Sequence, residues 1–172
     1  MRLFVAIEPA PGFRKALSVL QERILSAGIS ARYYVPSNLH MTLAFVGDWP
    51  ADISFLLPQV PAPFPITLSH VGVFSEANVM YAGVRPSEEL DALAEQVRFR
   101  LAEARIPYDS KPFYPHITLA RKPFVPENIK LEEIDVQPAV MTVRDVCLYK
   151  SEHGKNGMEY TVIGRSGNKT GG

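Results

Sequence analysis

Apolar residues along the chain follow two kinds of spacing, that of strands and that of helices. A short apolar run at residues 3–7 predicts a buried strand, and a second run at residues 79–84 predicts another. Each run is followed by apolar residues at helical spacing, which predicts a helix with one face against a sheet. These helical positions are Phe13, Leu17, Leu20 and Ile24 in the first segment and Leu90, Leu93, Val97 and Leu101 in the second. The pattern therefore predicts two units, each a strand followed by a helix.

Prolines and a serine mark the start of both predicted helices. Pro9 and Pro86 stop the two apolar runs, and proline is well tolerated in the first turn of a helix. Ser87 can cap the second helix through its hydroxyl. Residues 33–38 and the proline-rich residues 58–65 are expected to be connections, because proline lacks the backbone donor that a strand needs.

Further strands are predicted around and after the second unit. Residues 66–71 should pair with residues 79–84, and residues 39–46 should form a strand that ends in a Gly-Asp-Trp-Pro turn sequence. Residues 143–149 and 158–163 should form a final hairpin, because the Asn-Gly dipeptide between them favours a tight turn.

Each strand–helix unit leads to the same short motif. Residues 40–44 read His-Met-Thr-Leu-Ala, and residues 116–120 read His-Ile-Thr-Leu-Ala. The spacing from the proline that opens each helix to the histidine of the motif differs by one residue between the two copies. A strand, a helix and a motif that recur in register indicate an internal duplication, with repeats at roughly 1–50 and 79–125.

The two motifs carry the candidate chemistry. Side chains two residues apart on a strand point to one face, so His40 lies with Thr42 and His116 lies with Thr118. Two imidazoles that face one cleft suit a reaction that removes a proton on one side and delivers a proton on the other, such as phosphodiester cleavage. The two threonine hydroxyls can donate hydrogen bonds to the non-bridging phosphate oxygens.

Composition limits the alternatives. The 172 residues and the 47% hydrophobic content predict one globular domain at residues 1–165, followed by a flexible tail at residues 166–172. The 18 basic residues balance the 18 acidic residues, so a nucleic acid contact should be local. Cys147 is the only cysteine, which excludes an internal disulfide. There is no signal-peptide pattern and no apolar stretch of about 20 residues, so we expect a cytoplasmic protein without a membrane segment. We also expect a monomer.

Other kinds of site fit the sequence less well. A zinc site that uses His40 and His116 lacks the third and fourth ligands that zinc requires, so no metal and no cofactor are expected. The Gly-x-Ser-x-Gly signature of a serine hydrolase is absent from the sequence. His70 is expected to lie on the same face of its strand as Leu68, in the core or at an edge, and His153 is expected in a solvated connection. The alternative that stays open is a non-catalytic module that binds nucleotides or RNA ends on the same fold.

The paired His-x-Thr motifs resemble the signatures of the 2H phosphoesterase superfamily, and most closely its RNA 2',3'-cyclic phosphodiesterases, also called 2'-5' RNA ligases. The resemblance extends from residues 2–7 through residues 38–40 and 115–121 to residues 148–151 and Tyr160. It implies an α+β fold of two lobes related by pseudo-twofold symmetry, with two antiparallel β-sheets flanked by helices and a central cleft.

The resemblance also implies an activity. This activity is the metal-independent hydrolysis of RNA 2',3'-cyclic phosphate ends, or of small cyclic nucleotides, to 2'-phosphomonoesters, with possible reversal as 2'-5' RNA ligation in vitro. No obligate protein partner is implied. His40 would be the proton donor to the departing 3' oxygen, and His116 would be the proton acceptor that activates water. Thr42 and Thr118 would assist them.

Three further residues are candidates for substrate binding. Arg121 matches the arginine that follows the second motif in this branch and can bind phosphate. Strand alternation places Arg121 on the face opposite to His116 unless the strand ends or bulges at Ala120. Phe45, which occupies the place of Arg121 in the first motif, and Tyr114 can stack on a base.

Overall fold

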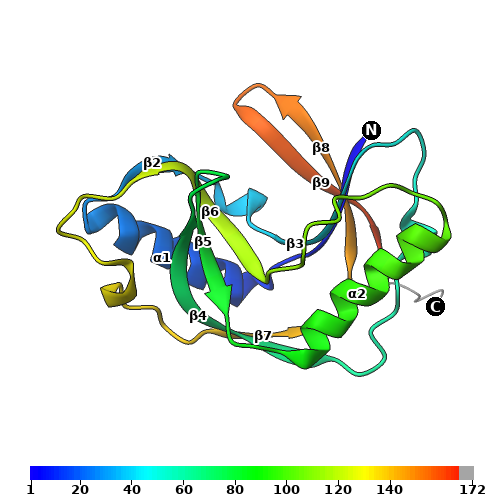
Figure 1. The fold of residues 1–172 in the computed structure, drawn as a ribbon, viewed down its shortest axis with the longest axis horizontal. Coiled ribbons are helices and arrows are strands. Elements are labelled where there is room, and N and C mark those ends of the chain that lie inside the picture. Colours follow the sequence, from blue (N-terminus) through cyan, green and yellow to red (C-terminus); the bar gives the residue numbers. More distant parts are fainter. Residues whose placement is uncertain (167–172) are drawn as a thin grey trace.

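The computed structural model describes residues 1–166, which form two α-helices and nine β-strands (Figure 1). The strands make two antiparallel sheets, as the resemblance implies. Sheet I has the order β3-β1-β8-β9. Its strands are β1 Arg2–Ile7, β3 Met41–Asp48, β8 Cys147–Gly154 and β9 Gly157–Arg165. Sheet II has the order β2-β6-β5-β4-β7. Its strands are β2 Ser30–Tyr33, β6 His116–Phe124, β5 Val79–Val84, β4 Phe64–Phe74 and β7 Val140–Val143.

The internal duplication appears in the strand order of the two sheets. In sheet I, β1 lies between β3 and β8, and in sheet II, β5 lies between β6 and β4. His40 directly precedes β3 and His116 is the first residue of β6, so each histidine motif occupies the same place in its sheet. Sheet II has one additional strand, β2, which pairs with the outer side of β6. The two lobes are therefore related in topology but differ beside the second motif.

The two helices are exchanged between the lobes. α1 Pro11–Ser26 follows β1 of sheet I in the sequence but packs beside β2 and β7 of sheet II. α2 Glu88–Glu103 follows β5 of sheet II but packs against β3 of sheet I (Figure 1). The apolar residues predicted to face a sheet are all buried, and they join one continuous hydrophobic core. Each repeat thus supplies the helix that covers the other repeat's sheet.

One hydrogen bond from each helix fixes the strand of the opposite motif. In α1 the Gln21 amide donates to the carbonyl oxygen of Leu119, at 2.9 Å. In α2 the Arg98 guanidinium donates to the carbonyl oxygen of Leu43, at 3.1 Å. Leu43 and Leu119 hold the same place in their motifs, and each is the extra residue at a β-bulge in its strand. The helices therefore provide partners for carbonyl groups where the strand ladder is interrupted.

Ser87 caps α2, as predicted, by accepting a hydrogen bond from the backbone nitrogen of Leu90 at 3.1 Å. Replacing Ser87 with Ala removes this acceptor and leaves a first-turn amide without its partner. We expect Ser87→Ala to lower the free energy of unfolding by about 1 kcal/mol, measured by urea denaturation. Ser87→Asp should retain most of the stability, because aspartate also caps. An equal loss in both variants would contradict the capping role.

One strand prediction is wrong and one strand was missed, and both have a physical explanation. Residues 143–149 do not form one strand, because β7 ends at Val143 in sheet II and β8 begins at Cys147 in sheet I. The residues between the two strands, Arg144-Asp145-Val146, include no glycine or proline that would mark a change of sheet. The short edge strand β2 was not predicted; it includes Tyr33, so the predicted connection at residues 33–38 begins one residue later and contains a 3₁₀ turn at Pro36–Asn38. Four residues are too few to show alternation.

Several boundaries also differ from the predictions. β4 includes Pro65, and β3 extends through Gly47 to Asp48, where Gly47 adopts a φ of +88°. The final hairpin is confirmed, with Lys155 and Asn156 as its two loop residues. Ser166, which the sequence-based expectation assigned to the tail, is buried and hydrogen-bonded to Val146. Residues 167–172, the remainder of the predicted tail, lie outside the described residues.

Candidate active site

The two motif histidines have the same backbone support. His40 immediately precedes β3, and its Nδ1 lies 2.7 Å from the carbonyl oxygen of Asn38. His116 is the first residue of β6, and its Nδ1 lies 2.6 Å from the carbonyl oxygen of Tyr114. A carbonyl oxygen only accepts hydrogen bonds, so Nδ1 must carry the proton in both rings. In both histidines Nε2 is therefore the nitrogen left to exchange a proton with a substrate.

Both imidazoles are partly buried among aromatic rings. The His40 ring centroid lies 4.7 Å from that of Phe4 and 5.2 Å from that of Tyr160. The His116 ring centroid lies 4.9 Å from that of Phe74 and 5.8 Å from that of Tyr81. These rings restrict each imidazole to one orientation and remove water from one side of it.

Burial lowers the pKa of both histidines. The pKa of His40 falls to about 4, mainly because the ring is desolvated and further because of the positive charges of His116 and Arg14, while the hydrogen bond to Asn38 opposes the change. Desolvation also lowers the pKa of His116, and the hydrogen bond to Tyr114 opposes it. Both rings are therefore neutral near pH 7 when no substrate is bound.

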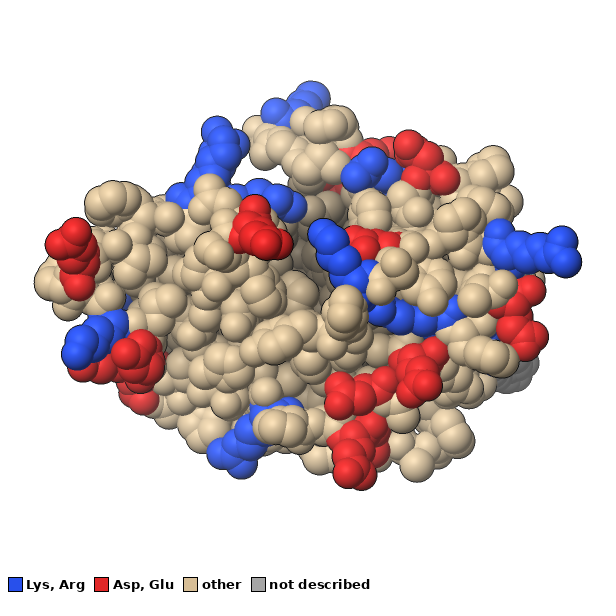
Figure 2. All heavy atoms as spheres, viewed as in Figure 1, with Lys and Arg blue, Asp and Glu red and all other residues tan. Residues whose placement is uncertain are grey.

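The two motifs line adjoining pockets, which we together call the cleft. A part of about 260 Å³ is lined by His40, and a part of about 960 Å³ is lined by His116. Four residues line both parts, namely Thr42, Phe45, Thr118 and Arg121. The space-filling view shows a hollow between the two lobes, with both basic and acidic side chains around its rim (Figure 2). The structure thus brings together both histidines and both threonines, as the motif pattern predicts.

A β-bulge places Arg121 in the cleft. Met80 pairs with Ala120 and Tyr81 pairs with Thr118, so Leu119 has no partner of its own on β5. This extra residue reverses the alternation, and Arg121 lines the cleft together with Thr118. Its guanidinium carbon lies 5.7 Å from the centroid of the Tyr34 ring.

The two aromatic candidates also border the cleft. Phe45 is 37% exposed, and the Arg2 guanidinium carbon lies 5.2 Å from its ring centroid. Tyr114 is 47% exposed, and its hydroxyl lies 3.4 Å from the hydroxyl of Tyr81. Aromatic side chains that are this exposed beside a cleft are available for stacking on a base.

Sequence reasoning missed the rings that enclose the histidines. Phe4 and Tyr81 were recognisable as a pair, because each lies five residues before the proline that opens the following helix. Phe74 comes from β4 and Tyr149 from β8, and they reach the site only through strand pairing. No local sequence signal marks such residues.

The remaining histidines lie outside the paired-motif arrangement. The prediction that His70 shares a face with Leu68 is wrong, because a register shift between Leu68 and His70 separates them. Leu68 is buried, whereas His70 is exposed with its ring 6.1 Å from that of Tyr81. His153 is exposed, as expected, although it lies within β8 rather than in a connection.

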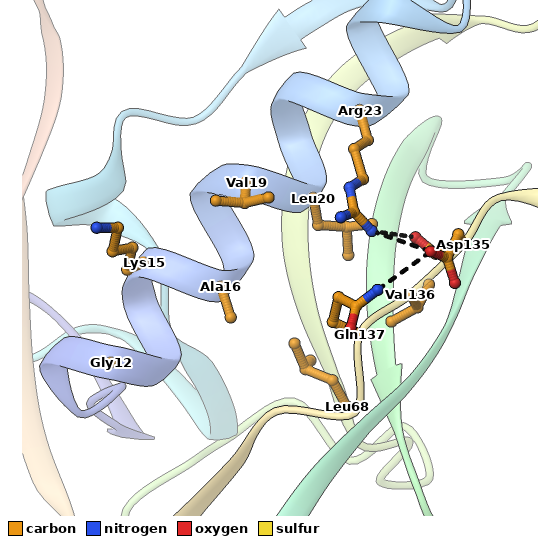
Figure 3. Close-up of a pocket in the computed structure, with 10 residues that line it drawn as sticks. All are labelled: Gly12, Lys15, Ala16, Val19, Leu20, Arg23, Leu68, Asp135, Val136 and Gln137. Carbon is orange, nitrogen blue, oxygen red and sulfur yellow. Dashed lines mark hydrogen bonds and ion pairs between the residues drawn. The ribbon is translucent and has the colours of Figure 1, made fainter.

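A separate cavity lies away from the cleft. It measures about 290 Å³ and lies between α1 and residues 135–137 (Figure 3). Arg23 and Asp135 form an ion pair across it at 3.3 Å, and Lys15 lies at its other end. None of its lining residues is shared with the cleft. It is therefore independent of the histidine motifs.

The model of the 2'-5' RNA ligase superfamily matches residues 13–155. This match covers most of the chain, including both motifs. The chain belongs to this superfamily. The assignment confirms the resemblance to the 2H phosphoesterases inferred from the sequence.

Curated relatives cover nearly the whole chain. An RNA 2',3'-cyclic phosphodiesterase of Thermotoga maritima is 28% identical, over 95% of this chain and 93% of its own length. An RNA 2',3'-cyclic phosphodiesterase of Thermus thermophilus is 30% identical, over 90% and 93% respectively. The corresponding Escherichia coli protein is 30% identical over 79% of both chains.

Solved structures show the same fold. The apo crystal structure of Escherichia coli LigT aligns with a TM-score of 0.79 at 27% identity, over 96% of this chain and 95% of LigT. The structure of LigT complexed with 3'-AMP aligns with a TM-score of 0.78 at 26% identity and covers 98% of both chains. The two-lobed α+β architecture is thus shared by members of the superfamily.

Two further findings concern the described part of the chain. Neither α1 nor α2 combines the length and the hydropathy that a helix needs to cross a bilayer. Within residues 1–166, no three His, Cys, Asp or Glu side chains come together in a group that could hold a metal ion.

Proposed function

We propose that this protein hydrolyses the 2',3'-cyclic phosphate ends of RNA to 2'-phosphomonoesters by a two-histidine acid–base mechanism that needs no metal. The observation that carries the proposal is one cleft lined by both histidines and both threonines, with each Nδ1 held by a backbone carbonyl. The names of several relatives, RNA 2',3'-cyclic phosphodiesterase, support the choice of substrate. The family membership supports catalysis over binding alone.

The proposed reaction is an in-line displacement at phosphorus. His116 Nε2 takes a proton from water as the water oxygen attacks phosphorus. The bond between phosphorus and the 3' oxygen breaks, and His40 donates its Nε2 proton to that oxygen. The product carries a 2'-phosphate and a free 3'-hydroxyl. Each proton transfer contributes about 100- to 10,000-fold in rate.

Other cleft residues stabilise the charge that develops on the phosphate. The hydroxyls of Thr42 and Thr118 donate to the non-bridging oxygens, and Arg121 supplies a permanent positive charge. Phe45 and Tyr114 hold the terminal nucleoside by stacking. The first motif has Phe45 where the second has Arg121, so the ionic contact is one-sided.

The low pKa of His40 requires a contribution from the substrate. Burial lowers the pKa of His40 to about 4, so a general acid at this position needs a neighbouring negative charge to retain its proton. The bound cyclic phosphate provides that charge. Substrate binding is therefore what charges His40 for proton donation.

The rate should depend on pH in a way that reflects both rings. Activity in kcat/KM needs a protonated His40 and a neutral His116 in the free enzyme. Because burial lowers the pKa of both rings, and that of His40 to about 4, the bell-shaped profile should have its maximum below about pH 6.5. The maximum of kcat should lie at higher pH, since bound phosphate raises both pKa values. Steady-state rates on a cyclic mononucleotide from pH 4 to 9 measure this, and a kcat/KM maximum above pH 7.5 would contradict it.

Metal independence has a direct test. The protein should hydrolyse a 2',3'-cyclic nucleotide at an unchanged rate in excess EDTA, because all proton transfers are assigned to side chains. If EDTA removes most of the rate and addition of a divalent cation restores it, the metal-independent mechanism is contradicted. Tight nucleotide binding without any product after long incubation would instead favour the alternative of a binding module.

RNA ligation would use the same attack on the cyclic phosphate with a different nucleophile. If a 5'-hydroxyl of RNA replaces water as the nucleophile, the same acid and base can form a 2'-5' linkage. We propose this as an activity in vitro only, because water is present at much higher concentration than RNA ends. A cytoplasmic monomer remains our expectation for the protein as a whole.

A further inference from the structure

A second arginine lies beside Arg121, on the strand that only sheet II has. Arg32 of β2 and Arg121 of β6 are directly paired in the antiparallel register. Paired residues on neighbouring strands point to the same face of a sheet. The neighbours of Arg32 fit this placement, because Ala31 and Tyr33 pack on the core, and Tyr34, which also packs on it, reaches the lining of the cleft. Arg32 is exposed and therefore extends the cleft face of sheet II outward to its edge.

Among the described residues, no carboxylate forms an ion pair with either arginine. Like charges directly opposite each other on neighbouring strands are destabilising. An anion placed between the two guanidinium groups removes this repulsion and can accept hydrogen bonds from both.

Protection of the sheet edge does not explain the choice of arginine. A charged residue on an edge strand discourages pairing with other chains. An aspartate or a glutamate at position 32 would do the same and would also pair with Arg121. A second cation at this position therefore points to an anionic ligand rather than to edge protection.

We propose that Arg32 binds the internucleotide phosphate next to the reactive terminus, with Arg121 lying between that phosphate and the cyclic phosphate. This inference rests on the function proposed above and adds a preference for RNA chains over mononucleotides. Neighbouring strands lie about 4.8 Å apart, so the two guanidinium groups can contact successive phosphates of one strand. β2 is at the edge of sheet II, so the rest of the RNA leaves the protein into solvent.

The test compares two ligands that differ by one nucleotide. Dissociation constants are measured by calorimetry for adenosine 2'-phosphate and for a 2'-phosphorylated ApA dinucleotide. Arg32→Ala should weaken binding of the dinucleotide roughly three- to tenfold and leave binding of the mononucleotide unchanged. The slope of log Kd against log salt for the dinucleotide should fall by about 0.7.

Two variants serve as controls. Arg32→Lys keeps the charge and should restore most of the dinucleotide affinity. Lys15→Ala removes a basic residue beside the separate cavity of Figure 3 and should leave the dissociation constants of both ligands unchanged. A threefold preference for the dinucleotide in the wild type that disappears in Arg32→Ala supports the subsite.

The subsite and the proposed function can be contradicted separately. Equal losses for both ligands in Arg32→Ala, or no loss for either, would remove the internucleotide subsite. Binding needs no turnover, so a wild type that binds both ligands with the expected difference but hydrolyses no cyclic phosphate would retain the subsite and remove the proposed function.

Discussion

Replacing either motif histidine with alanine should lower kcat on a 2',3'-cyclic nucleotide by about 100- to 10,000-fold. His40→Ala removes the proton donor to the 3' oxygen, and His116→Ala removes the base for water. In the variant that lacks both histidines, kcat should be only slightly lower than in the less active single variant, because the two groups act as a unit. The measurement is single-turnover hydrolysis with protein in excess.

The pH profile separates the roles of the two histidines. The proton acceptor must be neutral, so His116→Ala should lose the fall in kcat/KM at low pH. The proton donor must be charged, so His40→Ala should lose the fall at high pH. If instead His116→Ala loses the fall at high pH and His40→Ala loses the fall at low pH, the two histidines exchange roles and the two-histidine mechanism still holds.

A histidine outside the cleft provides the control for these variants. His153 is exposed near the end of β8, and His153→Ala should retain full activity. Thermal unfolding of all three variants checks that the fold survives. A folded His40→Ala or His116→Ala protein with near-normal turnover would remove that residue from the mechanism.

Replacing Thr42 or Thr118 with valine should lower kcat by about 100-fold each, with a smaller change in KM. Valine keeps the branched shape that suits a strand but removes the hydroxyl that donates to a non-bridging oxygen. Removal of one such donor from a site that stabilises developing charge costs about 100- to 1,000-fold in other enzymes. Steady-state kinetics on the cyclic nucleotide measures both parameters.

Thr161→Val is the matched control for the threonine variants, since Thr161 is exposed on β9. It should leave kcat and KM unchanged. If Thr42→Val and Thr118→Val raise KM but keep kcat, the hydroxyls bind the ground state and do not stabilise the transition state. That outcome would contradict the role proposed for them.

The sequence predicts the histidine–threonine pairs because the relevant information is local. Side chains two apart share a face of a strand, and the duplication indicates that both copies occupy equivalent places. The fold class follows from the same duplication and from the resemblance. The structure places His40, Thr42, His116 and Thr118 in the adjoining parts of the cleft.

Features that depend on pairing between distant strands were harder to predict. The bulge at Leu119 places Arg121 in the cleft, and it arises from the register between β5 and β6. The sequence around Arg121 allows either face. The change of sheet between Val143 and Cys147, and the approach of Phe74 to His116, also depend on which strands become neighbours.

The exchange of helices has a consequence for how the cleft admits a substrate. α1 and α2 each pack on the sheet of the opposite repeat. Gln21 and Arg98 donate hydrogen bonds to the bulges within the two strands that carry the motifs. The buried apolar residues of both sheets and both helices form one continuous core, so swinging the lobes apart would expose part of that core to water. The distance between the two imidazoles is therefore set before an RNA end binds. The terminal phosphate enters a preformed site, and binding requires no closure of the two lobes.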